Sequence, residues 1–200
     1  EIVAEIAAID FSRHEILFLL GQNVNSYAGT YQGKRLSFPE LLLLILDSCP
    51  QIPKLGFLTS HPKDMSDELI AILARFPKMD REIHFPLQAG SDRILQLMNR
   101  GYTYAQYKTL VEKLRTQVPA VRIATDLIVG FPTETEEEFQ QTLQAVHELR
   151  FHRVISAGYS PRQGTAAAQL PLLPQNIIDD RLRRLNDLVN EYKDKEPVVE

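Results

Sequence analysis

The chain has 200 residues, of which 44% are hydrophobic and 24% charged, and this composition is sufficient for one globular domain with a sizeable core. A single cysteine excludes an internal disulfide and any metal cluster held only by cysteines of this chain. The net charge of -4 argues against binding nucleic acid through bulk electrostatics, and no apolar run approaches the roughly 20 residues needed to cross a bilayer.

The first half of the chain alternates between predicted helices and buried strands. Isoleucines at helical spacing within residues 1–10 predict that the chain begins on a helix. Apolar runs predict strands over 15–21 and 54–59, and a polar loop is expected over 22–33. The helix that follows this loop is expected to end before Pro50.

Capping patterns mark the helix starts. In a capping box, a Ser or Thr is followed three residues later by Glu or Gln, and each satisfies a backbone N–H of the other. Three such pairs predict helix starts, at Ser37 with Glu40, Thr103 with Gln106, and Thr133 with Glu136. Ser66 predicts a further start, and a short helix is expected before Gly101.

Three more strands are predicted in the second half, over 82–88, 125–129 and 153–159. The apolar run Leu127 to Val129 lacks alternation, which is typical of a strand covered on both faces in a parallel sheet. A Gly-Phe-Pro turn follows it. Residues 166–174 are expected to be a connector, and residues 178–192 a long amphipathic helix.

Strict alternation of five strands with helices predicts parallel strands joined by right-handed crossovers, and a (βα) barrel is favoured over a doubly wound sheet. The helix at the start implies a missing upstream strand. The fold class is therefore α/β, a partial (βα)6 barrel with parallel strands 2 to 6 visible. We expect this core to span 1–195, with 196–200 as the start of a linker.

The carboxyl ends of parallel strands share one rim, where α/β folds keep their chemistry. The side chains expected there are Gln22, Asn23, Ser60, His61, Gln88, Ser91, Asp126, Gly130, Tyr159 and Arg162. Amides and hydroxyls dominate this set, so it suits binding a polar small molecule more than acid and base catalysis. No phosphate loop, nucleophile elbow or His-Glu-x-x-His motif is present.

Several candidates have competing interpretations. Asp126 interrupts an apolar strand and is costly to bury without a partner, which favours a functional role. His84 is more typical of a hydrogen-bonded core histidine, whereas His61 fits either role. Glu134 and the carboxylates at 136–138 fit stabilisation of a helix start.

Two alternative classes of protein remain open at this point. A metal-dependent barrel hydrolase would use His61, His84 and Asp126. A non-catalytic RNA-binding module would use basic helices such as Arg181 to Arg184, and it predicts RNA binding with a steep salt dependence.

The rim segments together resemble one family. They are Leu19 to Tyr27 (LLGQNVNSY), Thr59 to Pro62 (TSHP), His84 to Asp92 (HFPLQAGSD), Asp126 to Thr135 (DLIVGFPTET) and Tyr159 to Thr165 (YSPRQGT). In this order they resemble the radical S-adenosylmethionine methylthiotransferases, from the first residue to about residue 193. The segment GQNVNSY is similar to the branch that modifies isopentenylated adenosine beside the tRNA anticodon.

The resemblance implies S-adenosylmethionine as cofactor, two [4Fe-4S] clusters in the full-length protein and none in this fragment. In the family, Cys-x-x-x-Cys-x-x-Cys holds the first cluster, and that motif is absent here. The implied reaction inserts a methylthio group at C2 of the adenosine through a deoxyadenosyl radical, and the fragment alone is expected to be inactive. The resemblance further implies tRNA as partner, a flavodoxin or ferredoxin as electron donor, no membrane association, a monomer and a cytoplasmic location.

By the same resemblance, the residues expected at the cofactor are Gln22, Asn23, Ser60, Gln88, Ser91, Asp126, Ile128, Gly130, Phe131 and Tyr159. Those expected at the substrate are Asn25, Tyr27, His61 and Arg162, while no catalytic or metal-ligating residue is expected in the fragment. Ala89, Thr133 and Gln163 depart from the residues usual in the family. Gly130 is expected to allow close approach of a nucleoside, so that Gly130→Val abolishes cofactor binding whereas Glu134→Gln does little.

Overall fold

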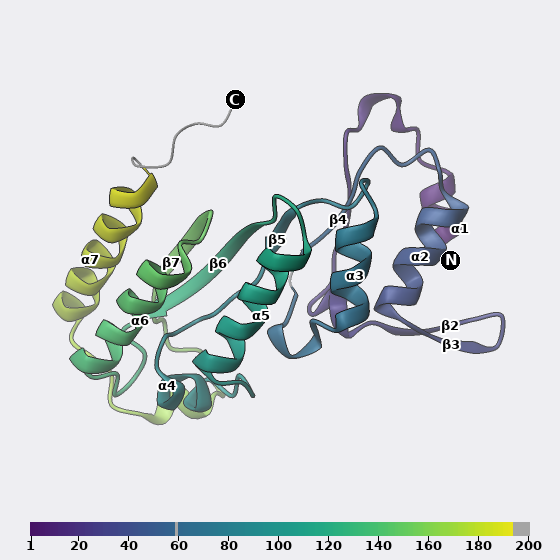
Figure 1. Ribbon diagram of the computed structural model, residues 1–200. Coiled ribbons are helices and arrows are strands. Elements are labelled where there is room, and N and C mark those ends of the chain that lie inside the picture. Colours follow the sequence, from purple (N-terminus) through teal and green to yellow (C-terminus); the bar gives the residue numbers. More distant parts are fainter. Residues whose placement is uncertain (59, 194–200) are drawn as a thin grey trace. The chain divides into compact units, whose positions relative to one another are not determined.

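The computed structural model describes residues 1–58 and 60–193, except for the side chains of the last two of these residues (Figure 1). The chain divides into two compact units. Unit 1 comprises Glu1–Phe85 and Glu112–Ile123, and unit 2 comprises Pro86–Val111 and Ala124–Glu200. The predicted linker, 196–200, lies outside the described residues.

Strands and helices alternate along most of the chain, as predicted. The strands are β1 (Leu17–Leu19), β2 (Ala28–Tyr31), β3 (Lys34–Ser37), β4 (Leu55–Phe57), β5 (Glu82–His84), β6 (Arg122–Val129) and β7 (Arg153–Gly158). The α-helices are α1 (Ile2–Ala7), α2 (Phe38–Ser48), α3 (Asp67–Arg75), α4 (Asp92–Leu97), α5 (Tyr104–Gln117), α6 (Glu136–Leu149) and α7 (Gln175–Lys193). Short 3-10 helices occupy Phe11–Arg13, Val24–Ser26, Pro62–Asp64 and Ala166–Gln169.

Unit 1 is built on the parallel pair β1 and β4, in which Leu17 lies beside Leu55 and Leu19 beside Phe57. Helix α2 packs against α3 and α1. Its first residue, Phe38, is buried and meets Phe57 edge-to-face, with ring centroids 5.2 Å apart. This aromatic contact joins the helix to the strand through the core of unit 1.

A β-hairpin replaces the polar loop expected over 22–33. Strands β2 and β3 pair antiparallel, and the two residues between them, Gln32 and Gly33, both have positive φ. This backbone is typical of the two-residue turns that match the twist of a hairpin. The prediction failed because the side chains of both strands are mostly exposed, so no apolar pattern marks them.

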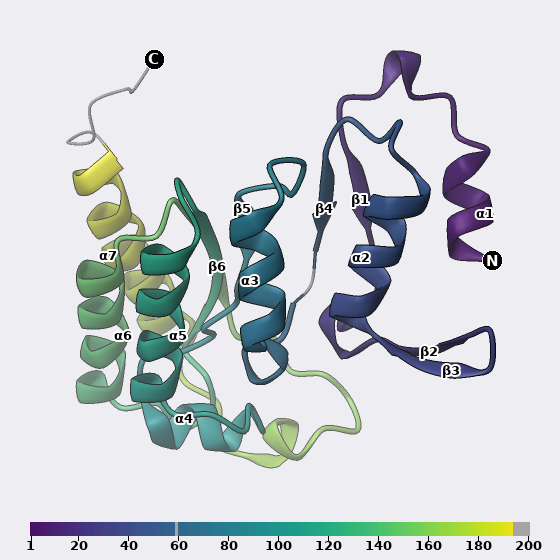
Figure 2. The same ribbon diagram turned by 45° about the vertical axis from the view of Figure 1, so that its right-hand side comes forward.

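In unit 2, β6 and β7 pair in parallel, with Asp126 beside Ile155 and Ile128 beside Ala157. Helices α6 and α7 pack against each other, and α7 packs on β7 (Figure 2). The parallel strands and the long helix near the carboxyl end confirm the predicted α/β class.

Two of the three predicted capping boxes are confirmed. Ser37 and Glu40 start α2, and the side chains at Thr103 and Gln106 bond each other's backbone N–H at the start of α5. The third is wrong, because α6 is capped by Thr135 with Glu138. Thr133 has φ +66°, whereas an N-cap residue needs extended backbone.

No helix within the described part of the chain is long and apolar enough to cross a membrane.

Candidate functional site

In unit 1, Asn25 ties together the segments that leave the adjacent strands β1 and β4. Its buried amide donates from Nδ2 to the His61 carbonyl at 2.9 Å, and its Oδ1 accepts the His61 N–H at 2.8 Å. The His61 side chain is also engaged, because Nδ1 accepts from the Lys63 backbone N–H at 3.2 Å. The two predicted substrate residues, Asn25 and His61, therefore lie together and brace each other.

The other rim residues of unit 1 differ in exposure. Ser60 is buried and its hydroxyl donates to the carbonyl of His84. Gln22 and Asn23 lie exposed after β1, and Tyr27 lies half-buried where the hairpin begins. Thus the exposed amides are available to a ligand, whereas Ser60 already has a backbone partner.

In unit 2, one face of the β6–β7 pair is covered and the other is open. Ser156 donates to Asn186 of α7 at 2.7 Å, and a Cβ on Gly158 would lie 2.7 Å from Ile178 of α7. The alternate residues of β6 and β7 point to the opposite face. These are Asp126, Ile128, Ile155 and Ala157, none of which is buried, and Ile155 is 48% exposed. Asp126 is thus half-buried on an open sheet face and not enclosed in the core.

Gln88 extends this open face with a strained backbone. Its N–H donates to the Asp126 carbonyl at 2.9 Å, and its own carbonyl accepts from the Ile128 N–H at 2.9 Å. Its φ of +77° is unusual for a residue with a side chain. Backbone strain of about 1–3 kcal/mol of this kind is often found at functional sites, where the surrounding structure enforces it.

Phe131 and Tyr159 pack together after the ends of β6 and β7. Their rings meet at 70° with centroids 5.1 Å apart. The Tyr159 N–H donates to the Val129 carbonyl at 2.8 Å, which fixes the start of the loop. The Tyr159 hydroxyl is buried and has no hydrogen-bond partner among the described residues. A buried hydroxyl without a partner costs free energy, so this oxygen is suited to a ligand.

A buried ion pair holds the Gly-Phe-Pro turn, and the sequence did not predict it. The Glu134 carboxylate accepts the Gly130 N–H at 2.8 Å and pairs with Arg181 of α7, Oε2 to Nη1, at 2.7 Å. Both side chains are almost fully buried, and Arg181 also lies over the Phe139 ring. Burial raises the pKa of Glu134, while the Gly130 N–H and Arg181 oppose that rise. Glu134 therefore does more than stabilise a helix start.

Gly130 is required by α7. It has φ +71°, and an added Cβ would lie 2.5 Å from Ile178 Cγ1. A close approach between Gly130 and a nucleoside was expected. In the direction in which a Cβ would point, however, the neighbour of Gly130 is the Ile178 side chain. A valine here would therefore disturb the packing of α7 in addition to any effect on a ligand.

The basic stretch of α7 is neutralised. Arg183 pairs with Asp180 and Asp187, and Arg184 pairs with Asp180 and Glu136. Together with buried Arg181, these pairs leave the stretch Arg181 to Arg184 without the uncompensated positive charge that an RNA-binding helix needs.

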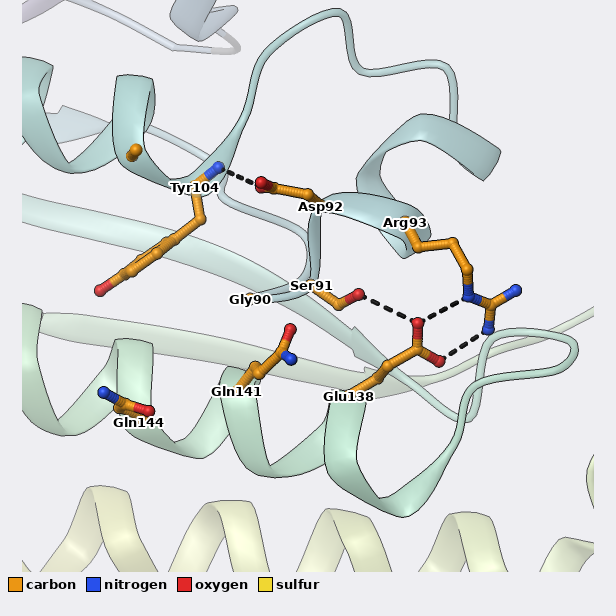
Figure 3. Close-up of a pocket in the computed structure, with 9 residues that line it drawn as sticks. Gly90, Ser91, Asp92, Arg93, Tyr104, Glu138, Gln141 and Gln144 are labelled. Carbon is orange, nitrogen blue, oxygen red and sulfur yellow. Dashed lines mark hydrogen bonds and ion pairs between the residues drawn. The ribbon is translucent and has the colours of Figure 1, made fainter.

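Ser91 belongs to a polar network between α4 and α6. Its hydroxyl donates to Glu138 at 3.1 Å, and Arg93 forms a two-pronged pair with the same carboxylate, each N–O distance being 2.7 Å (Figure 3). The hydrogen bond from Arg93 is the largest cause that lowers the pKa of Glu138 to about 2. This network lines a pocket of about 540 Å³. Because its charged groups already bond one another, we do not place the candidate site there.

Arg162 lies exposed in the loop after β7, and its carbonyl accepts from Thr165. No group of three or more His, Cys, Asp or Glu side chains among the described residues is placed to hold a metal ion. The three side chains that a hydrolase would use, His61, His84 and Asp126, therefore do not form such a group.

The fold and these strand ends define a class of protein. The profile of the Radical SAM superfamily matches residues 1–146, so the chain belongs to this superfamily. The solved structure of coproporphyrinogen III oxidase (HemN) from Escherichia coli, described as a radical SAM enzyme, matches with a TM-score of 0.64 at 17% identity. That match covers 76% of this chain and 37% of the other, and it confirms the predicted partial radical SAM-type barrel fold.

More similar sequences share one name. The chain is 48% identical over 170 residues to the tRNA-2-methylthio-N(6)-dimethylallyladenosine synthase of Dictyoglomus thermophilum, covering 84% of this chain and 38% of the relative. It is 46% identical over 187 residues to the synthase of the same name from Syntrophomonas wolfei, covering 93% of this chain and 42% of the relative. The chain thus spans about two fifths of the length of these relatives, and the resemblance to methylthiotransferases is confirmed.

The ion pair between Glu134 and Arg181 predicts a large cost for removing one partner. Glu134→Gln leaves a buried guanidinium without its main anionic partner, so we expect unit 2 to lose about 3–5 kcal/mol of unfolding free energy. The exposed control Glu137→Gln should change it by less than about 0.5 kcal/mol. Denaturant unfolding followed by circular dichroism measures both. Equal losses in the two variants would contradict the assignment.

The low pKa of Glu138 predicts acid sensitivity. Its folded pKa of about 2 lies below the ordinary 4.5, so the stability that its ionised form provides is present above pH 4.5 and is lost as the pH falls toward 2. In a series of melting curves from pH 6 to pH 2, Glu138→Gln and Arg93→Met should each flatten the decline in melting temperature. A decline as steep as that of the wild type in both variants would contradict the role of this pair.

Proposed function

We propose that the protein carrying this chain is a tRNA methylthiotransferase, which inserts a methylthio group at C2 of N6-isopentenyladenosine next to the anticodon. The observation that carries this proposal is the 48% identity to a synthase named for that modified nucleoside, over 84% of this chain. The segment GQNVNSY, after β1, supports the same branch. Its Asn25 forms two hydrogen bonds with the backbone of His61, which hold together the segments that follow β1 and β4.

The chemistry of unit 2 supports S-adenosylmethionine as its ligand. The open face of β6 and β7 offers apolar surface at Ile128 beside the Asp126 carboxylate, and the buried Tyr159 hydroxyl lacks a partner among the described residues. A nucleoside needs this combination of an apolar platform with a few polar contacts. We assign the nucleoside part of the cofactor to these residues, with Gln88, Gly130 and Phe131 shaping the strand ends.

Unit 1 is assigned the polar contacts. In this proposal, the exposed amides of Gln22 and Asn23 bind the amino-acid end of the cofactor, and Ser60 supports the backbone beside them. The family resemblance assigns Asn25, Tyr27, His61 and Arg162 to the substrate. When bound, S-adenosylmethionine supplies the radical chemistry, while the residues of this chain bind, orient and exclude water.

The donor set of this chain does not fit an iron–sulfur cluster. Such clusters need several thiolates, and the single cysteine, Cys49, is buried with a pKa that burial raises. The two [4Fe-4S] clusters of the proposed reaction must therefore be held by residues outside this chain. We accordingly propose that these 200 residues are inactive alone, and that the complete protein is a cytoplasmic monomer that receives electrons from a flavodoxin or ferredoxin.

The direct test of the function is nucleoside analysis. The complete gene that encodes this chain is expressed in a bacterial strain that makes N6-isopentenyladenosine but lacks the methylthiotransferase. We expect digested tRNA to contain 2-methylthio-N6-isopentenyladenosine by mass spectrometry. An empty vector should give only the unmethylthiolated nucleoside. If cells that express the gene also contain only the unmethylthiolated nucleoside, although the protein is soluble and loaded with its clusters, the proposal is contradicted.

The orphan hydroxyl gives a test of the cofactor site. Tyr159→Phe removes a buried polar atom that lacks a partner among the described residues, so we expect the stability of the ligand-free protein to stay equal or rise. Affinity for S-adenosylmethionine should fall about five- to tenfold, the effect of one hydrogen bond. Calorimetric titration of the complete protein measures this, with Tyr31→Phe as a control. If Tyr159→Phe binds S-adenosylmethionine with unchanged affinity, the Tyr159 hydroxyl does not contact the cofactor.

A further inference from the structure

Strands β2 and β3 of unit 1 and the turn between them are not used by the site described above. We define the arm as residues 27–37, which comprise Tyr27, strands β2 and β3 and the turn between them. Figures 1 and 2 both show the two strands extending away from the helices of unit 1. Most of its side chains are exposed, and the ring of Tyr31 is 44% exposed. Such an exposed ribbon contributes little to the core, so its side chains are available to contact a partner.

The two faces of the arm differ. Side chains directly opposite each other in an antiparallel pair lie on the same face, so Tyr31 and Lys34 share one face, and Thr30 and Arg35 share the other. Gly29 belongs to the Tyr31 face, because alternate residues of a strand point the same way. A Cβ on Gly29 would lie only 1.9 Å from the Tyr27 hydroxyl oxygen and 2.4 Å from Cζ. The Tyr27 ring therefore lies across Gly29, and two tyrosines and a lysine line one face.

The charge of the arm contrasts with the rest of the chain. Residues 27–37 contain Lys34 and Arg35 and no Asp or Glu, although the whole chain has a net charge of -4. Neither cation forms an ion pair with any carboxylate of the described residues, whereas Arg93, Arg181 and Arg184 all do. Two cations without such an ion pair thus lie next to Tyr31 and Tyr27 in the arm.

We propose that this arm binds single-stranded RNA, with Tyr31 and Tyr27 stacking on bases and Lys34 and Arg35 contacting phosphates. Aromatic side chains beside cations are the usual means of binding unpaired nucleotides. The inference rests on the proposed function, because it takes the RNA from the tRNA substrate. It extends that function by assigning an RNA contact to a segment distinct from the strand ends that are assigned to the cofactor.

The test measures binding of a fluorescein-labelled anticodon stem-loop RNA to the complete protein by anisotropy, over a series of KCl concentrations. Removing both cations, in Lys34→Gln with Arg35→Gln, should reduce the slope of log K against log salt by about 1.4, because each single-strand phosphate contact contributes about 0.7. Tyr31→Ala should weaken binding about five- to hundredfold without changing this slope. Tyr31→Phe retains the ring and should bind as the wild type does.

The matched control removes two exposed cations that are ion-paired, in Lys108→Gln with Arg183→Gln, and should leave the salt slope unchanged. Thermal unfolding of every variant confirms that it is folded. The proposal would be overturned if Tyr31→Ala and the double variant Lys34→Gln with Arg35→Gln both bound the RNA with the affinity and salt slope of the wild type. Arm-dependent RNA binding by a protein that yields no methylthio nucleoside would support the arm and contradict the proposed function. If the protein makes the methylthio nucleoside but its RNA binding does not depend on the arm, the proposed function is supported and the role of the arm is contradicted.

Discussion

The geometry of unit 2 depends on the carboxylate of Glu134. It accepts the Gly130 N–H at the end of β6 and pairs with Arg181, which comes from α7, 47 residues further along the chain. One buried oxygen thereby fixes the turn that ends the strand and the helix that covers the sheet. A buried pair costs desolvation, so its value lies in geometry more than in net stability. The Phe139 ring beneath Arg181 completes this enclosure.

The two faces of the β6–β7 sheet differ in how they are covered. On the helix side, Ser156 donates to Asn186 of α7. On the other side, the side chains of Asp126 and Ile128 are not enclosed, and Gln88 holds a strained backbone beside them. A strained backbone beside half-buried side chains on one face, with α7 packed on the other, supports the proposal that the ligand binds on the open face.

Local signals made much of the fold predictable, and non-local or weak signals account for what was missed. Apolar runs and the capping pairs at Ser37 and Thr103 are local, so the order of strands and helices followed from them. The hairpin was missed because its strands are exposed on both faces. Thr133 and Thr135 both precede a run of glutamates, and only the backbone geometry identifies Thr135 as the cap. The partner of Glu134 could not be predicted, because Arg181 is distant in sequence.

The central claim is that Glu134 couples the Gly130 turn to α7. Hydrogen–deuterium exchange of the complete protein, comparing wild type with Arg181→Met, tests it most directly. In the wild type, the Gly130 amide should be strongly protected, because it donates to a buried carboxylate. In the variant, exchange should accelerate together at Gly130 and along α7, with β1 and β4 of unit 1 unchanged. Rapid exchange of the Gly130 amide already in the wild type would contradict the account.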